Sequence, residues 1–205
     1  MKIVTPQVMA DIHQKKPIKI DLGSGGHGRE GFYSVDHLDL KGVDIIADLN
    51  KPLDLLPDNC VEHVYSRHAL EHVQELLPLM REIHRITRPD GTIEIVVPHF
   101  SNVYGFSDPT HVRFFGLYTM YYFVSPEHQP TKRKVPAFYT DARFNIISIK
   151  IDFYRSGLID KLFAKLITKI VNRSIRWQDF YERRLCHLFH AREIRYVMQP
   201  VKSTA

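Results

Sequence analysis

Acids and glycines near the start of the chain follow two short apolar runs, at positions where they could hold a nucleoside. Residues 18–22 are mostly apolar and lead into a glycine-rich turn at residues 23–26. Residues 31–35 form a second run, which Asp36 closes. Glycines let a ligand approach the backbone closely, and an acid after the second strand of an open α/β sheet can accept hydrogen bonds from ribose hydroxyls. The pattern predicts a nucleoside-binding site.

Two features argue against a dinucleotide as the ligand. The glycines of residues 23–28 fit the spacing G-x-G-x-x-G, but Asp36 follows Asp21 by only 15 positions. That interval is too short for the full helix that separates these elements in a dinucleotide site. Asp21 would also repel a phosphate, whereas it suits a cation. S-adenosylmethionine, a nucleoside that carries an ammonium and a sulfonium, fits these charges.

A second group of residues has the spacing of zinc ligands. His68, Glu71 and His72 match H-x-x-E-H, in which two histidines one helical turn apart bind zinc and a glutamate acts as general base. Glu127 or Glu182 could supply a third ligand. A zinc-dependent hydrolase is therefore an alternative function that this pattern allows.

A third group lies in residues 98–143, which are rich in aromatic residues and prolines. This segment is too long for a plain connection, and such excursions are typical of lids and binding elements. His99, Asp108 and His111 could serve as catalytic residues, because a hydroxyl acceptor needs a histidine or carboxylate to take its proton. We expect His111 or His99 to be the base, with Asp108 orienting a histidine or binding the acceptor. Arg113, Tyr104 and Tyr118 could line an acceptor pocket.

The elements that must position these groups alternate between strands and helices. We expect a leading helix or arm at 1–17, one helix at 69–87 that Pro78 kinks or splits, helical signals at 110–123 and two helices at 157–172 and 176–190. Residues 88–91 form a turn signal. The expected strands are 18–22, 31–36, 43–49, 61–66, 92–97, 144–153 and 193–198, with Pro200 ending the last. Alternation of this kind predicts an α/β fold with a doubly wound, mostly parallel seven-stranded sheet.

Composition bounds the organisation of the chain. Its 205 residues suit one domain, here 1–205, with 98–143 as a substrate or lid insertion and 154–192 as a basic helical appendage. Two cysteines fit a reducing compartment, so we expect a cytoplasmic protein. Residues 151–205 hold 11 Lys and Arg against 5 Asp and Glu, and so carry the basic excess. Residues 158–173 combine an apolar stripe with a lysine or arginine every four positions, which suits a peripheral contact with an anionic membrane or packing in a homodimer.

Four stretches of the chain, in this order, carry a family resemblance: DLGSGGHGREGFYSVD (21–36), DIIADLNKPLDLLPDN (44–59), VEHVYSRHALEHV (61–73) and EIHRITRPDGTIEIVVPH (82–99). With them the chain resembles the class I S-adenosylmethionine-dependent methyltransferases, especially small bacterial members of the methyltransferase type 11 group. The resemblance implies a Rossmann-like fold, S-adenosylmethionine as cofactor and no metal ion. One position departs from the family pattern, because His27 stands where the third glycine of D-x-G-x-G-x-G is usual.

The resemblance also implies which residues hold the cofactor. Asp21 would lie near its amino group, and Asp36 would accept hydrogen bonds from its ribose hydroxyls. The other implied contacts are Leu22, Gly23, Ser24, Gly25, Gly26, His37, Asp48, Leu49, Ser66, Arg67 and His68.

The function that these expectations favour is methyl transfer to a hydroxyl of a small molecule or glycan, such as a lipid-linked or polysaccharide precursor. We expect no nucleic-acid partner, because the sequence has no interleaved aromatic and basic pattern. The alternatives are the zinc-dependent hydrolase and a non-catalytic module that only binds S-adenosylmethionine.

Overall fold

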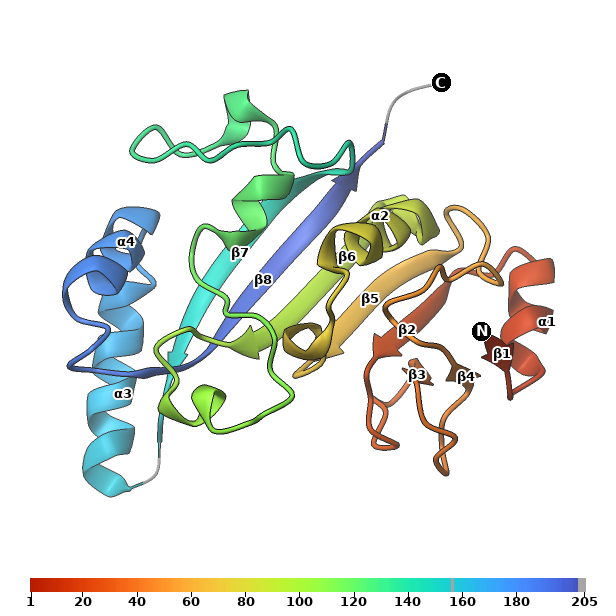
Figure 1. The fold of residues 1–205 in the computed structure, drawn as a ribbon, viewed down its shortest axis with the longest axis horizontal. Helices are drawn as coiled ribbons and strands as arrows, with labels where there is room; N and C mark the ends of the chain where they lie inside the picture. Colours follow the sequence, from red (N-terminus) through yellow and green to blue (C-terminus); the bar gives the residue numbers. More distant parts are fainter. Residues whose placement is uncertain (156, 203–205) are drawn as a thin grey trace.

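A computed structural model describes residues 1–155 and 157–202, apart from the side chains of residues 158–160 and 163. Its centre is one eight-stranded sheet with the order β1-β4-β3-β2-β5-β6-β8-β7 (Figure 1). The strands are β1 (Lys2–Ile3), β2 (Ile18–Leu22), β3 (Tyr33–Asp36), β4 (Ile45–Ile46), β5 (Val61–Arg67), β6 (Thr87–Pro98), β7 (Arg143–Phe153) and β8 (Ala191–Val201).

The sheet is parallel in its centre and antiparallel at both edges. β2 pairs in parallel with β3 and β5, and the parallel set continues through β4 and β6. β8 is antiparallel to both β6 and β7, and β1 is antiparallel to β4. The predicted mostly parallel α/β sheet is confirmed, but the number of strands is wrong by one. The additional strand is β1, whose two residues are too few to show a pattern in the sequence.

The helix expected at 69–87 is two helices. A 3₁₀ turn, η1 (Leu70–His72), is followed by α2 (Leu76–Ile86), and the side chain of Asn50 accepts hydrogen bonds from the backbone N–H groups of Gln74 and Glu75 between them. Pro78 lies in the first turn of α2, where a missing N–H costs little. The chain is therefore interrupted before Pro78 and not at it.

Two expected interruptions lie inside strands. Val61 pairs with Thr87 and His63 with Thr92, so the turn signal at residues 88–91 forms a bulge in β6. β8 continues through Pro200, which pairs with Phe144 of β7. This proline is tolerated because the pairing of β8 with β6 ends at Met198.

Residues 98–143 are partly built into the body of the protein. They contain three short 3₁₀ helices, η2 (Val103–Phe106), η3 (Thr119–Phe123) and η4 (Pro126–His128). Within the predicted helical region 110–123, only η3 is helical. Phe115, Met120 and Phe123 are buried in the main core, whereas Tyr104 and Phe106 are exposed. Exposed residues are thus spread along the segment, with runs at 106–110, 126–128 and 131–134.

The remaining helices flank the two ends of the sheet. α1 (Gln7–His13) follows β1, and α3 (Leu158–Val171) and α4 (Ile175–Arg184) lie together beside β7 (Figure 1). Among the described residues, no helix is both long enough and apolar enough to cross a membrane.

Candidate functional site

The carboxyl ends of β2, β3 and β5 meet at one edge of the sheet, where the glycine turn follows β2. Gly23 has φ +71°, and a β-carbon added there would lie 2.2 Å from the β-carbon of Ala69. Its N–H donates to the carbonyl of Val35. Gly25 and Gly26 also have positive φ angles. The turn therefore needs glycine both for its backbone conformation and for its contact with the start of η1.

Asp36 fixes this turn and lies at the cavity beside it. Its carboxylate accepts hydrogen bonds from the N–H of Gly25 at 2.8 Å and from the N–H of Leu38 at 3.0 Å. The imidazole of His37 is 3.2 Å from the same carboxylate. Asp36 is buried, and each carboxylate oxygen keeps acceptor capacity beyond these bonds.

A cavity of about 480 Å³ opens at this edge, within the size range of small-molecule sites. Six of the residues that line it are predicted cofactor contacts: Gly23, Asp36, His37, Asp48, Leu49 and His68. Five others were not predicted as cofactor contacts: Asn50, Ala69, His72, Val73 and Thr110. His72 stood out in the sequence only through the zinc pattern, and Thr110 only as part of the segment that begins at Asp108.

A second cavity, of about 360 Å³, lies on the other side of Gly23. Asp21, Ser24 and Arg67 line it, together with His27, Arg29 and Tyr65. Asp21 accepts a hydrogen bond from the N–H of Arg29 at 3.0 Å, and burial raises the pKa of its carboxyl. The structure thus divides the predicted cofactor contacts between two cavities that share Gly23.

Four predicted contacts line neither cavity: Leu22, Gly25, Gly26 and Ser66. The N–H of Gly25 donates to Asp36. Leu22 is fully buried, so only its backbone could reach a ligand. Ser66 donates from its hydroxyl to the carbonyl of Leu22 at 3.0 Å and ties β5 to β2. A β-carbon on Gly26 would lie 3.3 Å from Leu40, so this glycine serves the packing of the turn.

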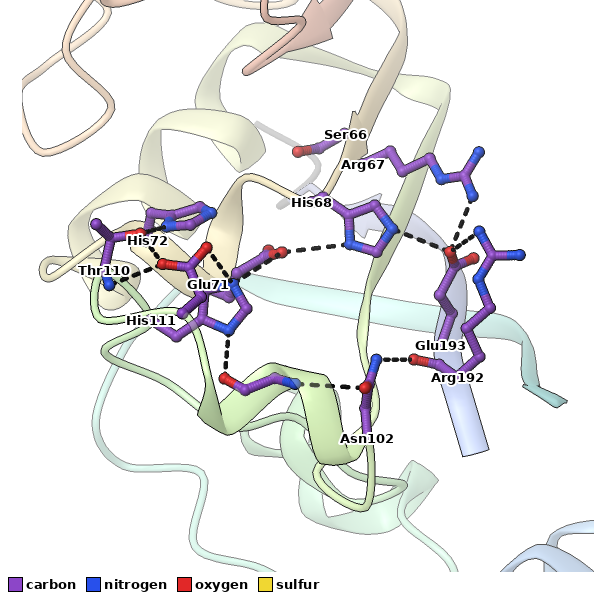
Figure 2. Close-up of polar contacts among 12 residues, drawn as sticks. Ser66, Arg67, His68, Glu71, His72, Asn102, Thr110, His111, Arg192 and Glu193 are labelled. Carbon is purple, nitrogen blue, oxygen red and sulfur yellow. Dashed lines mark hydrogen bonds and ion pairs between the residues drawn. The ribbon is translucent and has the colours of Figure 1, made fainter. Parts of the chain in front are cut away.

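His68 directly follows β5 and has a left-handed conformation, with φ 54°. Its Nε2 is 2.9 Å from a carboxylate oxygen of Glu193, and its Nδ1 is 3.3 Å from Oε1 of Glu71 (Figure 2). The hydrogen bond to Glu193, followed by the nearby carboxylate of Glu71, raises the pKa of His68 to about 9. His68 is therefore a cation at neutral pH, at the edge of the first cavity.

Glu193 of β8 gathers three cations. Besides His68, it pairs with Arg67 at 2.8 Å and with Arg192 at 2.9 Å. His68 and Arg67 outweigh the cost of burial and lower the pKa of Glu193 to about 2. The guanidinium of Arg67 is thus directed at Glu193.

The zinc-hydrolase arrangement of His68 and His72 is not formed. His68 lies before η1 with a non-helical backbone, and both of its ring nitrogens face carboxylates. Glu182, one of the two expected third ligands, accepts hydrogen bonds from Leu117 and His99 instead. The H-x-x-E-H interpretation is therefore wrong for this pair of histidines.

The expected catalytic residues lie in two different places. His99 is fully buried, and its Nδ1 accepts a hydrogen bond from the N–H of Ser101 at 3.1 Å. Its Nε2 therefore carries the proton and donates to Glu182 at 3.1 Å. Both nitrogens of His99 are engaged in the interior, and the ring lines neither cavity.

His111 and Asp108 lie beside the first cavity. The Nδ1 of His111 donates to the carbonyl of Gly105 at 2.8 Å, which leaves Nε2 without a proton in the neutral ring. That Nε2 is 3.7 Å from Asp108 and 4.0 Å from Oε1 of Glu71, and the ring packs edge-to-face on His72 (Figure 2). Asp108 is exposed and accepts from Thr110, which lines the cavity.

Comparison with known proteins agrees with this geometry. Residues 33–95, just under a third of the chain, match the family model described as a methyltransferase domain. No curated protein matches the chain. A crystal structure of an S-adenosylmethionine-dependent methyltransferase from Archaeoglobus fulgidus is similar, with a TM-score of 0.52 and 16% identity over 95% of this chain and 93% of that one. The YcgJ protein from Bacillus subtilis is similar with a TM-score of 0.53 and 14% identity, over 97% of this chain and 99% of that one.

At these identities the two structures support the fold alone. The family model covers β3, β4 and β5 but not β2 or the glycine turn after it. The predicted cofactor, S-adenosylmethionine, is that of this family. The matched methyltransferase domain and the fold of these structures both support a class I S-adenosylmethionine-dependent methyltransferase.

Proposed function

We propose that this methyltransferase acts on a hydroxyl oxygen of a small hydroxylated acceptor, with a glycan as the favoured class. The observation that carries the proposal is the tautomer of His111. Its Nδ1 donates to a backbone carbonyl, so Nε2 can accept a proton beside the cavity that Asp36 lines. A hydroxyl acceptor needs such a group, because an alcohol is a poor nucleophile until its proton is taken.

The residues around the two cavities suit the cofactor. The buried carboxylate of Asp36 would accept from the ribose hydroxyls, and the glycine turn would lie against the methionine portion. Asp21 would face the ammonium, and the His68 imidazolium suits the carboxylate of the same portion. When bound, the cofactor supplies a methyl group already activated by a sulfonium.

His111 is the proposed general base, and Asp108 stabilises the imidazolium that forms. Asp108 is 3.7 Å from Nε2, so its carboxylate can pair with the imidazolium once the proton has been taken. Thr110, which donates to Asp108, lies between this pair and the cavity. Alignment of the acceptor oxygen with the methyl group would supply most of the acceleration. His99 has no role in the proposed mechanism, because both of its ring nitrogens form hydrogen bonds in the protein interior.

Exposed aromatic rings on η2, whose Gly105 carbonyl accepts from His111, favour a glycan acceptor. Tyr104 and Phe106 of η2 are exposed, and Phe106 stacks on Phe114 with ring centroids 4.7 Å apart. Flat apolar faces with polar tips suit sugar rings. The two other residues expected in an acceptor pocket are otherwise engaged, because Tyr118 is buried against Asp179 and Arg113 donates to backbone carbonyls.

The test is methyl transfer from labelled S-adenosylmethionine to a panel of hydroxyl, amine and thiol acceptors that includes sugars. We expect O-methylated products, and we expect His111→Gln to lower kcat by about 100-fold or more, the range of a lost general base. His13→Gln, at an exposed histidine outside the site, is the matched control. Products methylated only on nitrogen, sulfur or carbon would contradict the proposal.

We propose in addition that α3 contacts an anionic membrane surface, where a lipid-linked acceptor would be presented. Leu162 and Leu166 are 75% and 58% exposed, and Trp177 and Phe180 of α4 are also exposed. Lys161, Lys165 and Lys169 are exposed on the same helix. Exposed apolar side chains bordered by lysines are typical of helices that lie in a membrane interface.

A further inference from the structure

We propose that Glu71, His72 and His111 form a binding site for one divalent transition-metal ion, of which Zn²⁺ is the representative. One ligand atom from each residue lies within 4.8 Å of those of the other two. The site adjoins the cavity assigned to the cofactor, because His72 lines that cavity. It differs from the H-x-x-E-H pattern, since His111 replaces His68 and Glu71 is a ligand instead of a base.

The buried carboxylate of Glu71 supports this site. Glu71 is 1% exposed, and neither of its side-chain oxygens has a hydrogen-bond partner among the described residues. Oε1 faces His68 at 3.3 Å and His111 at 4.0 Å, whereas no ion pair reaches Oε2 (Figure 2). The His68 imidazolium offsets the charge at Oε1, but Oε2 has no polar partner among the described residues. Buried carboxylate oxygens are normally hydrogen-bonded or bound to a metal, because burying an unsatisfied polar atom is costly.

The tautomers of the two histidines also support the site. The hydroxyl of Thr110 donates to Asp108 at 2.6 Å, so in its 2.8 Å contact with His72 it must accept from Nδ1. His111 likewise donates from Nδ1, to the carbonyl of Gly105. Both rings therefore present an unprotonated Nε2. Metal-bound histidines characteristically donate their other N–H in this way, which fixes the ring for coordination.

The donor set identifies the class of ion. Two imidazoles and one carboxylate suit Zn²⁺ and neighbouring transition ions, whereas Mg²⁺ prefers oxygen ligands alone. Coordination at bond lengths of about 2.1 Å would draw the three donor atoms together by roughly 1 Å. His72 is exposed and its neighbour Thr110 lies in an exposed segment, so the cluster can make this adjustment and admit the ion. Three protein ligands leave a position for a substrate oxygen.

The role of the ion rests on the proposed function, methyl transfer to a hydroxyl. In the metal-loaded protein the role of His111 differs from that of a general base. A hydroxyl bound to the metal has a lowered pKa and loses its proton to water near Asp108, so His111 acts as a ligand in the metal-loaded protein. The acceptor oxygen then forms its bond to the methyl carbon, and the carbon–sulfur bond breaks with its electron pair passing to sulfur. The metal is neither oxidised nor reduced.

The experiment is equilibrium dialysis of chelator-stripped protein against Zn²⁺, with bound metal measured by mass spectrometry and Mg²⁺ present in a parallel series. We expect one Zn²⁺ per chain and no competition from Mg²⁺. Glu71→Gln and His111→Asn should each weaken binding by at least about 100-fold, because even residues that only support metal ligands cost 10- to 100-fold. His187→Asn, at an exposed histidine outside the cluster, should bind normally. Circular dichroism verifies that each variant is folded.

Failure to bind Zn²⁺ stoichiometrically would overturn the metal site, as would equal binding by wild type, Glu71→Gln and His111→Asn. The methyl-transfer assay on stripped protein separates this failure from that of the proposed function. Continued O-methylation without metal binding would leave His111 as the base. Metal binding without methylation of any hydroxyl acceptor would leave the site and remove the proposed function.

Discussion

At the scale of single residues, Gly23 makes the most specific structural demand. Alanine there would combine a left-handed backbone with an overlap against Ala69. We expect Gly23→Ala to destabilise the protein by about 3 kcal/mol and to abolish cofactor binding. Gly31→Ala is the matched control, because Gly31 has φ +77° with nothing within 4 Å of an added β-carbon. Its cost should be about 1 kcal/mol. Urea unfolding of both variants measures the difference, and equal costs would contradict the packing argument.

Short motifs in the sequence were enough to predict Asp36, His37, Asp48 and Leu49 as cofactor contacts. The structure places all four around one cavity. Glu71 and His72 were visible as part of H-x-x-E-H, but the partner that the fold brings to them is His111. No spacing rule links residues 72 and 111, since their contact depends on how the chain returns after β6.

At the scale of elements, the loop after β4 depends on α2. Glu82 of α2 accepts a hydrogen bond from the N–H of Leu53 at 2.8 Å, and Arg85 donates to the carbonyl oxygens of Leu53 and Leu56. The hydrogen bond from Arg85 lowers the pKa of Glu82. This loop follows Asp48 and Leu49, so α2 holds one wall of the cavity.

A pH dependence follows from this contact. Because the pKa of Glu82 is lower in the folded protein, its contribution to stability is present above the unfolded pKa of about 4.3 and is lost as the pH falls through the folded value. Glu82→Gln should therefore lower Tm at pH 7, with a smaller difference at pH 3.5. Glu127→Gln, at an exposed glutamate, should change Tm at neither pH. A Tm difference for Glu82→Gln that is the same at both pH values would argue against the ion pair.

The contact of α3 with a membrane is tested by sedimentation with vesicles. We expect binding to vesicles that contain anionic lipid, weaker binding at high salt, and none to purely zwitterionic vesicles. Leu162→Ser combined with Leu166→Ser should reduce binding at least tenfold. Phe138→Ser, which removes another exposed apolar side chain at 79% exposure, should leave binding unchanged. Equal binding by both variants, or no binding by wild type, would contradict the proposal.

The ends of strands and helices were predicted correctly where the local sequence pattern was clear. They were missed where contacts with residues far along the chain determine them. β2 occupies residues 18–22 as expected, because its apolar run ends at the glycine turn. β1 forms only because β4 offers an edge, and β8 continues through Pro200 because one of its neighbours has ended. The break before α2 depends on the side chain of Asn50, 24 residues before Gln74.

At the scale of the whole molecule, the sheet brings residues from distant parts of the chain to one edge. Asp36 arrives with β3, His68 with β5, Glu193 with β8 and His111 with the segment after β6. The parallel strands bring Asp36 and His68 to this edge, and the antiparallel β8 supplies Glu193, which holds His68 in place. The sequence predicted the first of these contributions, since its motifs are local. It did not predict the second, since it depends on the order of strands.

The cavity beside Asp36 is the proposed cofactor site. Isothermal titration of S-adenosylhomocysteine into wild type, Asp36→Ala and Asp39→Ala tests it most directly, because Asp39 is an exposed acid three positions away. We predict one site per chain with micromolar affinity in wild type and Asp39→Ala, and a loss of at least 30-fold, or about 2 kcal/mol, in folded Asp36→Ala. Absence of binding in wild type, or equal binding by all three proteins, would contradict the account.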